Sequence, residues 1–384
     1  MRGNLRRLFL ALIVVAALAA LAYHSRHRIH LADFTWRNFI HAVGEANVWF
    51  LLLSFFAIYG CYLLRALRWQ RFSRYLGHAR LVDVYSGTVM GFAAIFVLGR
   101  AGEPVRPLLL ARKARQPVAS MFGIWVLERL FDFGAAVALA SLSLLVFAGG
   151  LSDAGANSDW VEQARAGGWI LLGMLAVVVA LMVYFRLHGA GALERRLGYW
   201  RAAGGWRGWT ATIIAGFSDG LQSIRSVSDL LTALAYSAAH WVLATLVYLM
   251  VCRAFSGAFA YSDMNFPGAM LLLALTLVGS TLQLPGVGGG AQVASFIALT
   301  TIFGVEQEPA AAVAVVLWLI TFASSTLVGI PLLIHEGLSM GELRKLVRAE
   351  TAAEESGAHL SILGLSGFES GGPPKASDRG GDPR

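Results

Sequence analysis

The sequence predicts an all-α membrane protein that crosses the bilayer several times. Of its 384 residues, 57% are hydrophobic and only 14% are charged. A soluble chain is about 45–50% apolar and about 25% charged, so this chain has too little polar surface to cover a water-soluble body. Long apolar segments are the third observation, because a membrane-spanning helix needs about 20 such residues. The same composition excludes a large catalytic domain outside the membrane.

Nine apolar segments follow one another along the chain. They are Leu8–Tyr23, Val48–Leu64, Val84–Leu98, Val118–Phe147, Trp169–Phe185, Leu230–Val251, Gly268–Leu284, Ala291–Phe303 and Ala310–Ile334. The third, seventh and eighth are short for a span, and each adjoins a break rich in glycine at 99–104 or 285–290. We therefore expect six full spans and two re-entrant helical hairpins, at 84–115 and 268–304. Two short full spans are the alternative to each hairpin, because hydrophobic mismatch costs only fractions of a kcal/mol per Å.

Arginine and lysine in the connections predict the orientation of these segments. Positive charge is concentrated in residues 1–7, 65–83, 112–115, 186–229 and the C-terminal side. The positive-inside rule places these parts, and hence both termini, in the cytoplasm. Residues 24–47 are the exception, since they must be external and yet carry three arginines. The order span, span, hairpin, span then occurs twice with opposite orientation, which predicts inverted repeats at about 8–149 and 167–335.

The predicted transmembrane domain covers residues 1–348. Within it, the polar stretch 188–229 has apolar residues at helical spacing and predicts a cytoplasmic amphipathic linker on the bilayer surface. Residues 349–384 are rich in glycine, serine and proline and predict a disordered cytoplasmic tail. The basic start and first apolar segment also fit a signal peptide, whose cleavage would remove one member of the repeat.

Six charged residues at or beside membrane depth mark the expected substrate site. Half of them belong to the first break and the turn after it, and half to the following span. They are Arg100, Glu103, Arg106, Glu128, Arg129 and Asp132. Each charge costs about 2.5–3.5 kcal/mol at the bilayer centre on insertion scales, so they should pair or face a wet cavity. A cavity for a charged substrate group is the functional interpretation, and a structural ion-pair network is the alternative.

Both breaks also predict helices that start deep in the membrane. Pro104 suits the first turn of one helix, and the other is expected to start near Gly290. Free N–H groups and the partial positive charge at two such N-termini favour an anion, for which phosphate is the natural candidate. The residues expected to line this part of the site are Gln283, Pro285, Gly286, Gly288, Gly289, Gly290 and Gln292. The glutamines could equally satisfy the loop backbone, and a flexible break that only lets helices pack is the alternative.

The remaining candidate ligands predict no metal or cofactor. Cys61 and Cys252 lie in apolar stretches without CxxC spacing, so we expect buried free thiols. Three histidines within residues 24–30 have no acidic or cysteine partner. His240 lies within a span, where we expect a satisfied buried histidine, with proton coupling as the alternative. The positive-inside rule explains the excess of positive charge, so we expect no nucleic-acid partner.

Three short motifs resemble the transmembrane region of lysylphosphatidylglycerol synthases, a flippase-like membrane domain. Residues 99–106 (GRAGEPVR) resemble its GRxGE…R element, 128–132 (ERLFD) its ER…D element, and 284–290 (LPGVGGG) its late Pro-Gly-Gly motif. Their order and spacing match over about residues 5–340. The resemblance implies a lipid flippase or lipid-handling transporter of the inner membrane, with the six charged residues above as its polar site.

The chain also departs from that family. A glutamate often follows the late glycine motif, whereas Gln292 stands here, so a proton-coupling or cation-binding role at this position does not carry over. Bifunctional members append a soluble aminoacyl-transfer domain. Only a short tail follows residue 349, so lysyl-lipid synthesis is not expected.

These observations together predict a transporter that moves an anionic or lipid-linked amphipathic substrate across the inner membrane without catalysis. The arginines would hold a phosphate or sugar-phosphate, and the carboxylates would orient the arginines. One alternative is an intramembrane transferase acting on a lipid-linked donor, with Glu103 or Asp132 as general base. Another is a non-transporting scaffold in envelope lipid biosynthesis. A homo-oligomer and partners in envelope biosynthesis both stay open.

Overall fold

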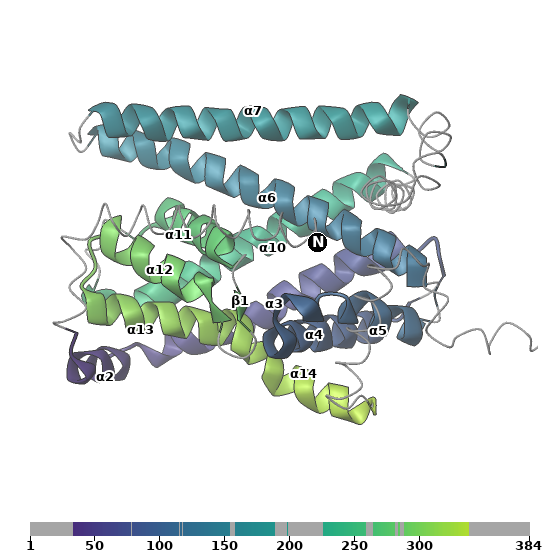
Figure 1. The fold of residues 1–384 in the computed structure, drawn as a ribbon, viewed down its shortest axis with the longest axis horizontal. Coiled ribbons are helices and arrows are strands. Elements are labelled where there is room, and N and C mark those ends of the chain that lie inside the picture. The colour runs from purple at the N-terminus through teal and green to yellow at the C-terminus, as the bar shows by residue number, and fades with distance from the viewer. Residues whose placement is uncertain are drawn as a thin grey trace, which may run out of the picture.

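The computed structural model describes residues 34–77, 79–114, 116, 118–153, 158–188, 198, 226–258, 264–280, 283–284 and 288–337. These residues are almost entirely helical (Figure 1). The predicted first span, most of the linker 188–229 and the tail 349–384 lie outside the described residues.

The first half of the described chain consists of helices with short connections. Its elements are α2 (Trp36–Gly44), α3 (Val48–Ser73), α4 (Leu81–Leu98), the 3₁₀ turn η2 (Gly99–Gly102), α5 (Val105–Ala114) and α6 (Val118–Asp153). Helix α3 begins at Val48 as predicted, and the side chain of its N-cap Asn47 accepts a hydrogen bond from the Trp49 N–H at 3.0 Å. It then runs to Ser73, so residues 65–73, which were expected in a connection, belong to this helix. This segment contains no glycine or proline, and two of its arginines find partners inside the protein.

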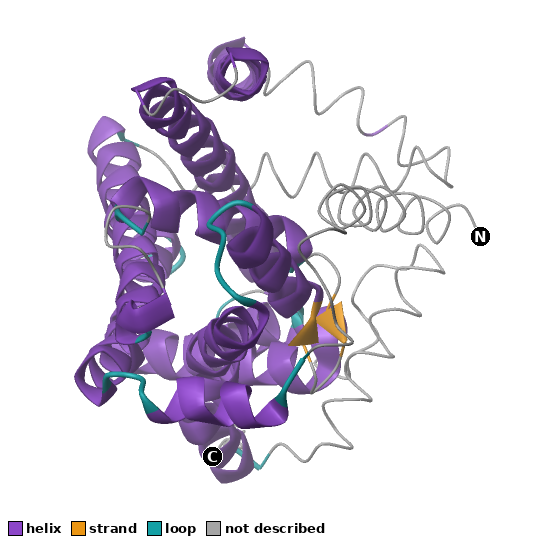
Figure 2. Ribbon diagram, turned by 90° about the vertical axis from the view of Figure 1, so that its left-hand side faces the viewer, coloured by secondary structure: helices purple, strands orange, loops and turns teal. Residues whose placement is uncertain are grey.

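The second half adds a further set of helices and one very short strand pair. Its elements are α7 (Ser158–His188), α10 (Val227–Ala254), η3 (Ser256–Ala258), α11 (Phe266–Gly279), β1 (Gln283–Leu284), β2 (Gly288–Gly289), α12 (Gly290–Thr301), α13 (Gln307–Trp318), η4 (Leu319–Ala323) and α14 (Ser324–His335). Strands β1 and β2 pair antiparallel, with Gln283 opposite Gly289. This pair lies at one edge of the helical body (Figure 2). The π-helical turn η4 joins α13 and α14 into one long helix.

Five helices in the described part of the chain are long and apolar enough to cross a membrane. They are Val48–Ser73, Leu81–Leu98, Ser120–Val146, Val227–Ala254 and Gln307–His335. The protein is therefore a multi-pass membrane protein of the all-α class, as predicted. One of the five is α4, the first limb of the predicted first hairpin, which starts at Leu81 instead of Val84. That limb has the length of a full span, whereas α5 has only 10 residues.

Each predicted hairpin forms two helices that pack side by side. Helix α4 packs against α5, and α11 packs against α12. Their second limbs begin at Val105 and Gly290, next to the positions expected from Pro104 and the glycine run. In the second hairpin, Gly279 approaches Gly290 so closely that a Cβ on Gly279 would overlap the Gly290 carbonyl.

Several helices of the first half pack against helices of the second half. Helix α3 lies along α10, α4 packs against α14, and α11 packs against α6. The breaks of the two hairpins also meet, because η2 contacts β1. Helix α7 packs along α6 at the periphery (Figure 1). The hydrophobic core is thus built from contacts between segments far apart in the sequence, with the charged residues of α3 and α6 enclosed beside it.

Candidate functional site

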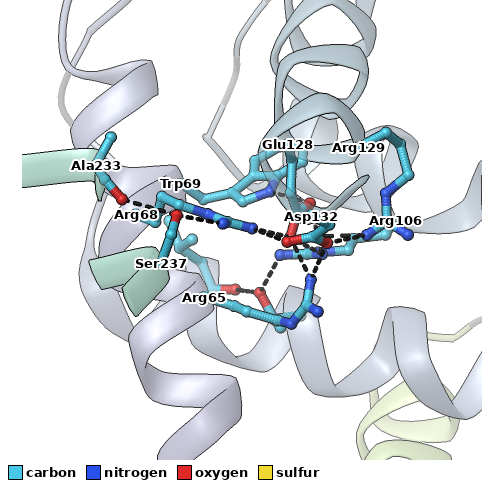
Figure 3. Close-up of polar contacts among 11 residues, drawn as sticks. Arg65, Arg68, Trp69, Arg106, Glu128, Arg129, Asp132, Ala233 and Ser237 are labelled. Carbon is cyan, nitrogen blue, oxygen red and sulfur yellow. Dashed lines mark hydrogen bonds and ion pairs between the residues drawn. The ribbon is translucent and has the colours of Figure 1, made fainter. Parts of the chain in front are cut away.

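A buried cluster of arginines and carboxylates lies where α3, α5 and α6 meet (Figure 3). Arg65 and Arg68 are three residues apart on α3, and Glu128 and Asp132 are four apart on α6. Both spacings place the two side chains on one helix face. Helix α5 adds Arg106 to these four. All five side chains are buried.

Glu128 is the centre of the cluster and is fully buried. Its Oε1 accepts hydrogen bonds from Arg65 at 2.9 Å, Arg68 at 3.1 Å and Arg106 at 3.0 Å. Its Oε2 accepts from the Trp69 indole N–H at 2.5 Å and from Arg106 at 2.8 Å. One carboxylate therefore joins α3, α5 and α6, which makes it the residue whose loss would leave the most charge unpaired.

Asp132 lies one turn further along α6 and binds the same α3 arginines. Its Oδ2 accepts from Arg65 at 2.6 Å and Arg129 at 3.1 Å, and its Oδ1 accepts from Arg68 at 2.8 Å. Arg68 also donates to Ser237 Oγ at 2.7 Å, which ties α10 to the cluster. Arg65 and Arg68 each bind both carboxylates, whereas Arg106 binds only Glu128.

The cluster carries more positive than negative charge. Among the described side chains, four arginines (65, 68, 106 and 129) face two carboxylates, which leaves a formal excess of two positive charges. The Nε atoms of Arg68 and Arg106 are buried and have no hydrogen-bond partner among the described residues. Buried ion pairs are favourable only when their hydrogen-bonding groups are satisfied. Excess positive charge and free donors are features that anion-binding sites share.

Aromatic rings hold Arg106 on its other faces. The Cζ atom of Arg106 lies 4.8 Å from the ring centroid of Trp69 and 5.7 Å from that of Phe92. Such cation–π contacts stabilise a guanidinium by about 0.5–2 kcal/mol, with the larger values in desolvated sites. Its Nη2 also donates to Thr88 on α4 at 3.3 Å. Trp69 thus contacts both Arg106 and its counterion Glu128.

Four of the six charged residues predicted from the sequence meet in this cluster, namely Arg106, Glu128, Arg129 and Asp132. Glu103 does not join it, because this half-buried side chain forms no ion pair with any residue of the described part. Arg100 is placed in η2, but its side chain lies outside the described set. Among the described side chains, the cluster therefore differs from the predicted set of six by the absence of Glu103 and the presence of Arg65 and Arg68.

Sequence reasoning missed Arg65, Arg68 and Trp69. The two arginines were interpreted as topology signals because they follow an apolar segment of span length. A signal was present, since residues 65, 68 and 71 are all arginines at a spacing that repeats on one helix face. A count of charge per connection cannot distinguish an arginine that faces water from one that faces a buried carboxylate.

The second part of the predicted site surrounds the glycine run. The backbone N–H of Gly289 donates to Gln292 Oε1 at 2.6 Å, so Gln292 satisfies loop backbone, one of the two roles left open. Gly289 has a positive φ of 115°, a backbone conformation that favours glycine. Gly288 lies in β2 and Gly290 begins α12, while Pro285 and Gly286 lie outside the described residues. The side chain of Gln283 lies outside them as well.

Cys61 and Cys252 are free and buried, as predicted. His240 is buried too, but its Nδ1 has no hydrogen-bond partner in the described part of the protein. The expectation of a satisfied histidine was therefore wrong at this atom. Within the described residues, no group of three or more potential metal ligands occurs. The histidines at 24–30 lie outside that part.

A separate polar cavity of about 520 Å³ lies at the other end of α3. Helix α2, the turn η3 and residues 304–309 line it, with Asn38, Glu45 and Glu306 among the polar groups. Helix α3 starts beside this end, and Arg65 is 17 residues further along at 1.5 Å per residue. The arginine cluster is therefore not part of this cavity.

The fold and the site define a multi-pass helical membrane protein with a cationic cluster enclosed between its helices. The family model for the lysylphosphatidylglycerol synthase transmembrane region matches residues 8–329. The chain therefore belongs to this family, which confirms the resemblance in its three motifs. No curated protein matches the chain.

Proposed function

We propose that this protein transports a lipid with an anionic headgroup across the inner membrane, and that the arginine cluster binds the headgroup. Membership in the family supports a role in lipid metabolism or transport. The observation that carries the more specific proposal is a buried cluster whose described side chains have an excess of two positive charges and include arginine Nε atoms without a partner among the described residues. Intramembrane charges of this kind generally belong to substrate pathways.

The contacts within the cluster suggest which arginines bind the headgroup. Arg65 and Arg68 each form ion pairs with both carboxylates, so we expect these two arginines to hold Glu128 and Asp132 in position. Arg106 has one carboxylate partner and belongs to the short limb α5. Arg129 is 40% exposed. We therefore assign Arg106 and Arg129 to the headgroup, which would replace their protein carboxylates with a phosphate in the bidentate geometry that arginine favours.

We also propose that the two halves form an inverted repeat, with both termini in the cytoplasm. The packing supports an inverted repeat, because a contact made by an element of one half recurs for the corresponding element of the other half. Helix α4 packs against the last span of the second half, and α11 packs against the last span of the first half. Helices α3 and α10 then correspond to each other at the centre. In transporters built this way, alternating access is largely a rocking of one repeat against the other.

The proposal includes no catalytic step. All four oxygens of Glu128 and Asp132 accept hydrogen bonds from arginine or tryptophan. A carboxylate whose lone pairs are already used is poorly placed to take a proton from a substrate. This disfavours Asp132 as the general base of the transferase alternative. It does not bear on Glu103, the other general base considered.

Reconstitution into liposomes tests the transport proposal. Full-length protein should accelerate leaflet exchange of fluorescently labelled phosphatidylglycerol relative to empty liposomes. Arg106→Gln should slow this exchange by about 10- to 100-fold, because a hydrogen bond to a charged group contributes about 1.5–3 kcal/mol.

Arg253→Gln is the matched control, since Arg253 is an exposed arginine on the last turn of α10. It should exchange lipid at the wild-type rate. Wild-type exchange no faster than in empty liposomes, across a panel of anionic and lipid-linked substrates, would contradict transport. In cells, a scaffold would retain its function in Arg106→Gln, whereas a transporter would lose it.

A further inference from the structure

His240 lies beside the arginine cluster without taking part in its ion pairs. It follows Ser237, which accepts a hydrogen bond from Arg68, by one turn of α10. Its backbone carbonyl accepts a hydrogen bond from Cys61 Sγ at 3.9 Å, one turn before Arg65 on α3. Its side chain is 94% buried, since its relative exposure is 6%. Both neighbouring contacts therefore place His240 at the interface of α10 and α3, next to the two arginines that hold the carboxylates.

The imidazole of His240 has unused hydrogen-bonding capacity. Its Nδ1 has no partner within the described residues. The ring packs edge-on against Trp241, with the two ring centroids 5.1 Å apart. This contact is between the rings and provides no hydrogen bond to Nδ1. A neutral imidazole has one donor and one acceptor nitrogen, and both become donors when it is protonated. An isolated buried nitrogen of this kind is a position where a proton can be bound and released.

The charged groups that face His240 come from two other helices. Arg65 and Arg68 of α3 and Asp132 of α6 interact with it electrostatically, and its neighbours on α10, Ser237 and Trp241, carry no charge. Arginine keeps its proton at all physiological pH values. Among the buried residues of the described part, His240 is the sole histidine. It is therefore the residue type in this group whose charge ordinarily changes between about pH 5 and about pH 8.

We propose that His240 is a proton-binding site coupled to the headgroup site, so that a proton and an anionic headgroup bind together and leave together. This inference rests on the proposed function. Protonation of His240 would add a third positive charge beside the excess of two, and repulsion opposes this protonation. A bound anion offsets the repulsion. Because linkage is reciprocal, a proton on His240 strengthens headgroup binding by the same factor. The proton comes from water, binds one imidazole nitrogen and returns to water, and no other bond changes.

Binding of a lipid with constant charge tests the coupling. Dioctanoyl phosphatidylglycerol has a phosphodiester that stays monoanionic from about pH 5 to about pH 8, so a change in affinity over this range reports on the protein. Isothermal titration calorimetry on the full chain in detergent should give an affinity that falls about tenfold as the pH rises, the size expected for a coupling of about one pKa unit. His240→Gln should remove this slope and keep the wild-type affinity at the upper end.

His41→Gln is the matched control, because His41 is an exposed histidine on α2 whose partner is Glu45. This variant should leave the wild-type slope unchanged. A second measurement does not depend on a variant. Titrations in two buffers with different ionisation heats should show net proton uptake when the wild-type protein binds the lipid at the pH values where its affinity depends on pH.

The outcomes separate the two proposals. Lipid binding that is equal at both ends of the pH range, or wild-type binding without proton uptake, overturns the role of His240 and leaves the headgroup site intact. A slope that persists in a folded His240→Gln protein also overturns it. If that variant does not elute as a single species, His240→Asn and the wild-type proton uptake decide the question. Absence of lipid binding at every pH in wild-type protein would overturn the headgroup site and this inference with it.

Discussion

The hairpin α4–η2–α5 and the hairpin α11–α12 share a construction, in which two helices pack side by side across a short break. They differ in what holds them in the protein. The first carries Arg106, which is buried against Glu128 and Trp69. Residues 266–301, which contain the second, include no aspartate, glutamate, lysine or arginine.

The second hairpin is instead held by close backbone approach and hydroxyl groups. Gly279 lies against Gly290, and the hydroxyls of Thr276 and Ser295 are hydrogen-bonded at 2.8 Å. Small residues and hydroxyls are the usual means of helix association in membranes, where no hydrophobic force brings helices together. The same arrangement of two packed helices thus occurs once with a buried charge and once without any charge. We therefore expect loss of an ion pair to affect the first hairpin most and added side-chain volume to affect the second.

The largest effect is expected for Glu128→Gln. This substitution removes the carboxylate that Arg65, Arg68 and Arg106 share and leaves three buried guanidiniums with less negative charge. Loss of one partner from a buried ion pair costs about 3–5 kcal/mol. Thermal unfolding in detergent, followed by size-exclusion fluorescence, should show a large decrease in melting temperature.

Glu103→Gln is the control for this prediction, because Glu103 is half-buried and forms no ion pair within the described part. Its melting temperature should stay close to that of the wild type. Equal losses in the two variants would mean that the cluster around Glu128 does not hold the first hairpin.

An intermediate effect is expected for Gly279→Ala. The added Cβ would overlap the carbonyl oxygen of Gly290 and the Cβ of Ala294, so the limbs of the second hairpin must move apart. Overpacking of this kind costs about 1–3 kcal/mol. Gly173→Ala in α7 introduces the same methyl group where no heavy atom lies within 4 Å. It should leave the melting temperature unchanged or raise it slightly, and a similar loss in both variants would refute the steric explanation.

The smallest effect is expected for Thr276→Val. Valine keeps the shape of the side chain and removes the hydroxyl that is hydrogen-bonded to Ser295. One such bond contributes about 1 kcal/mol. Thr232→Val removes a hydroxyl that bonds only its own helix at an exposed position, so its melting temperature should be higher than that of Thr276→Val. If Thr276→Val destabilised the protein more than Gly279→Ala, the hydroxyl pair would be the main element of this hairpin.

Local signals predicted much of the fold. Asn47 precedes a long apolar run, and α3 begins at Val48. Pro104 and the glycine run mark two helix starts, and α5 and α12 begin at Val105 and Gly290. These predictions succeeded because a helix start depends on residues within one or two turns of it.

The site was predicted only in part. Glu128 and Asp132 are recognisable because two carboxylates on one face of an apolar helix need partners. Their main partners, Arg65 and Arg68, lie 60 or more residues earlier in the chain, and a count of charge per connection treats these arginines as topology signals. Glu103 was included because it lies in a charged motif, but motif membership does not fix where a side chain points.

Composition and local pattern alone determined that this chain is a helical membrane protein, with two glycine-containing breaks and with charged residues in or beside its apolar segments. Insertion of an apolar segment into a membrane and the start of a helix both depend on residues that are neighbours in the sequence. The sequence is therefore sufficient to predict both. The tertiary structure decided which charges meet, because ion pairing depends on the approach of α3, α5, α6 and α10 from distant parts of the chain. It also decided the charge balance among the described side chains of the site, since the two arginines from α3 add two positive charges that the predicted set did not contain.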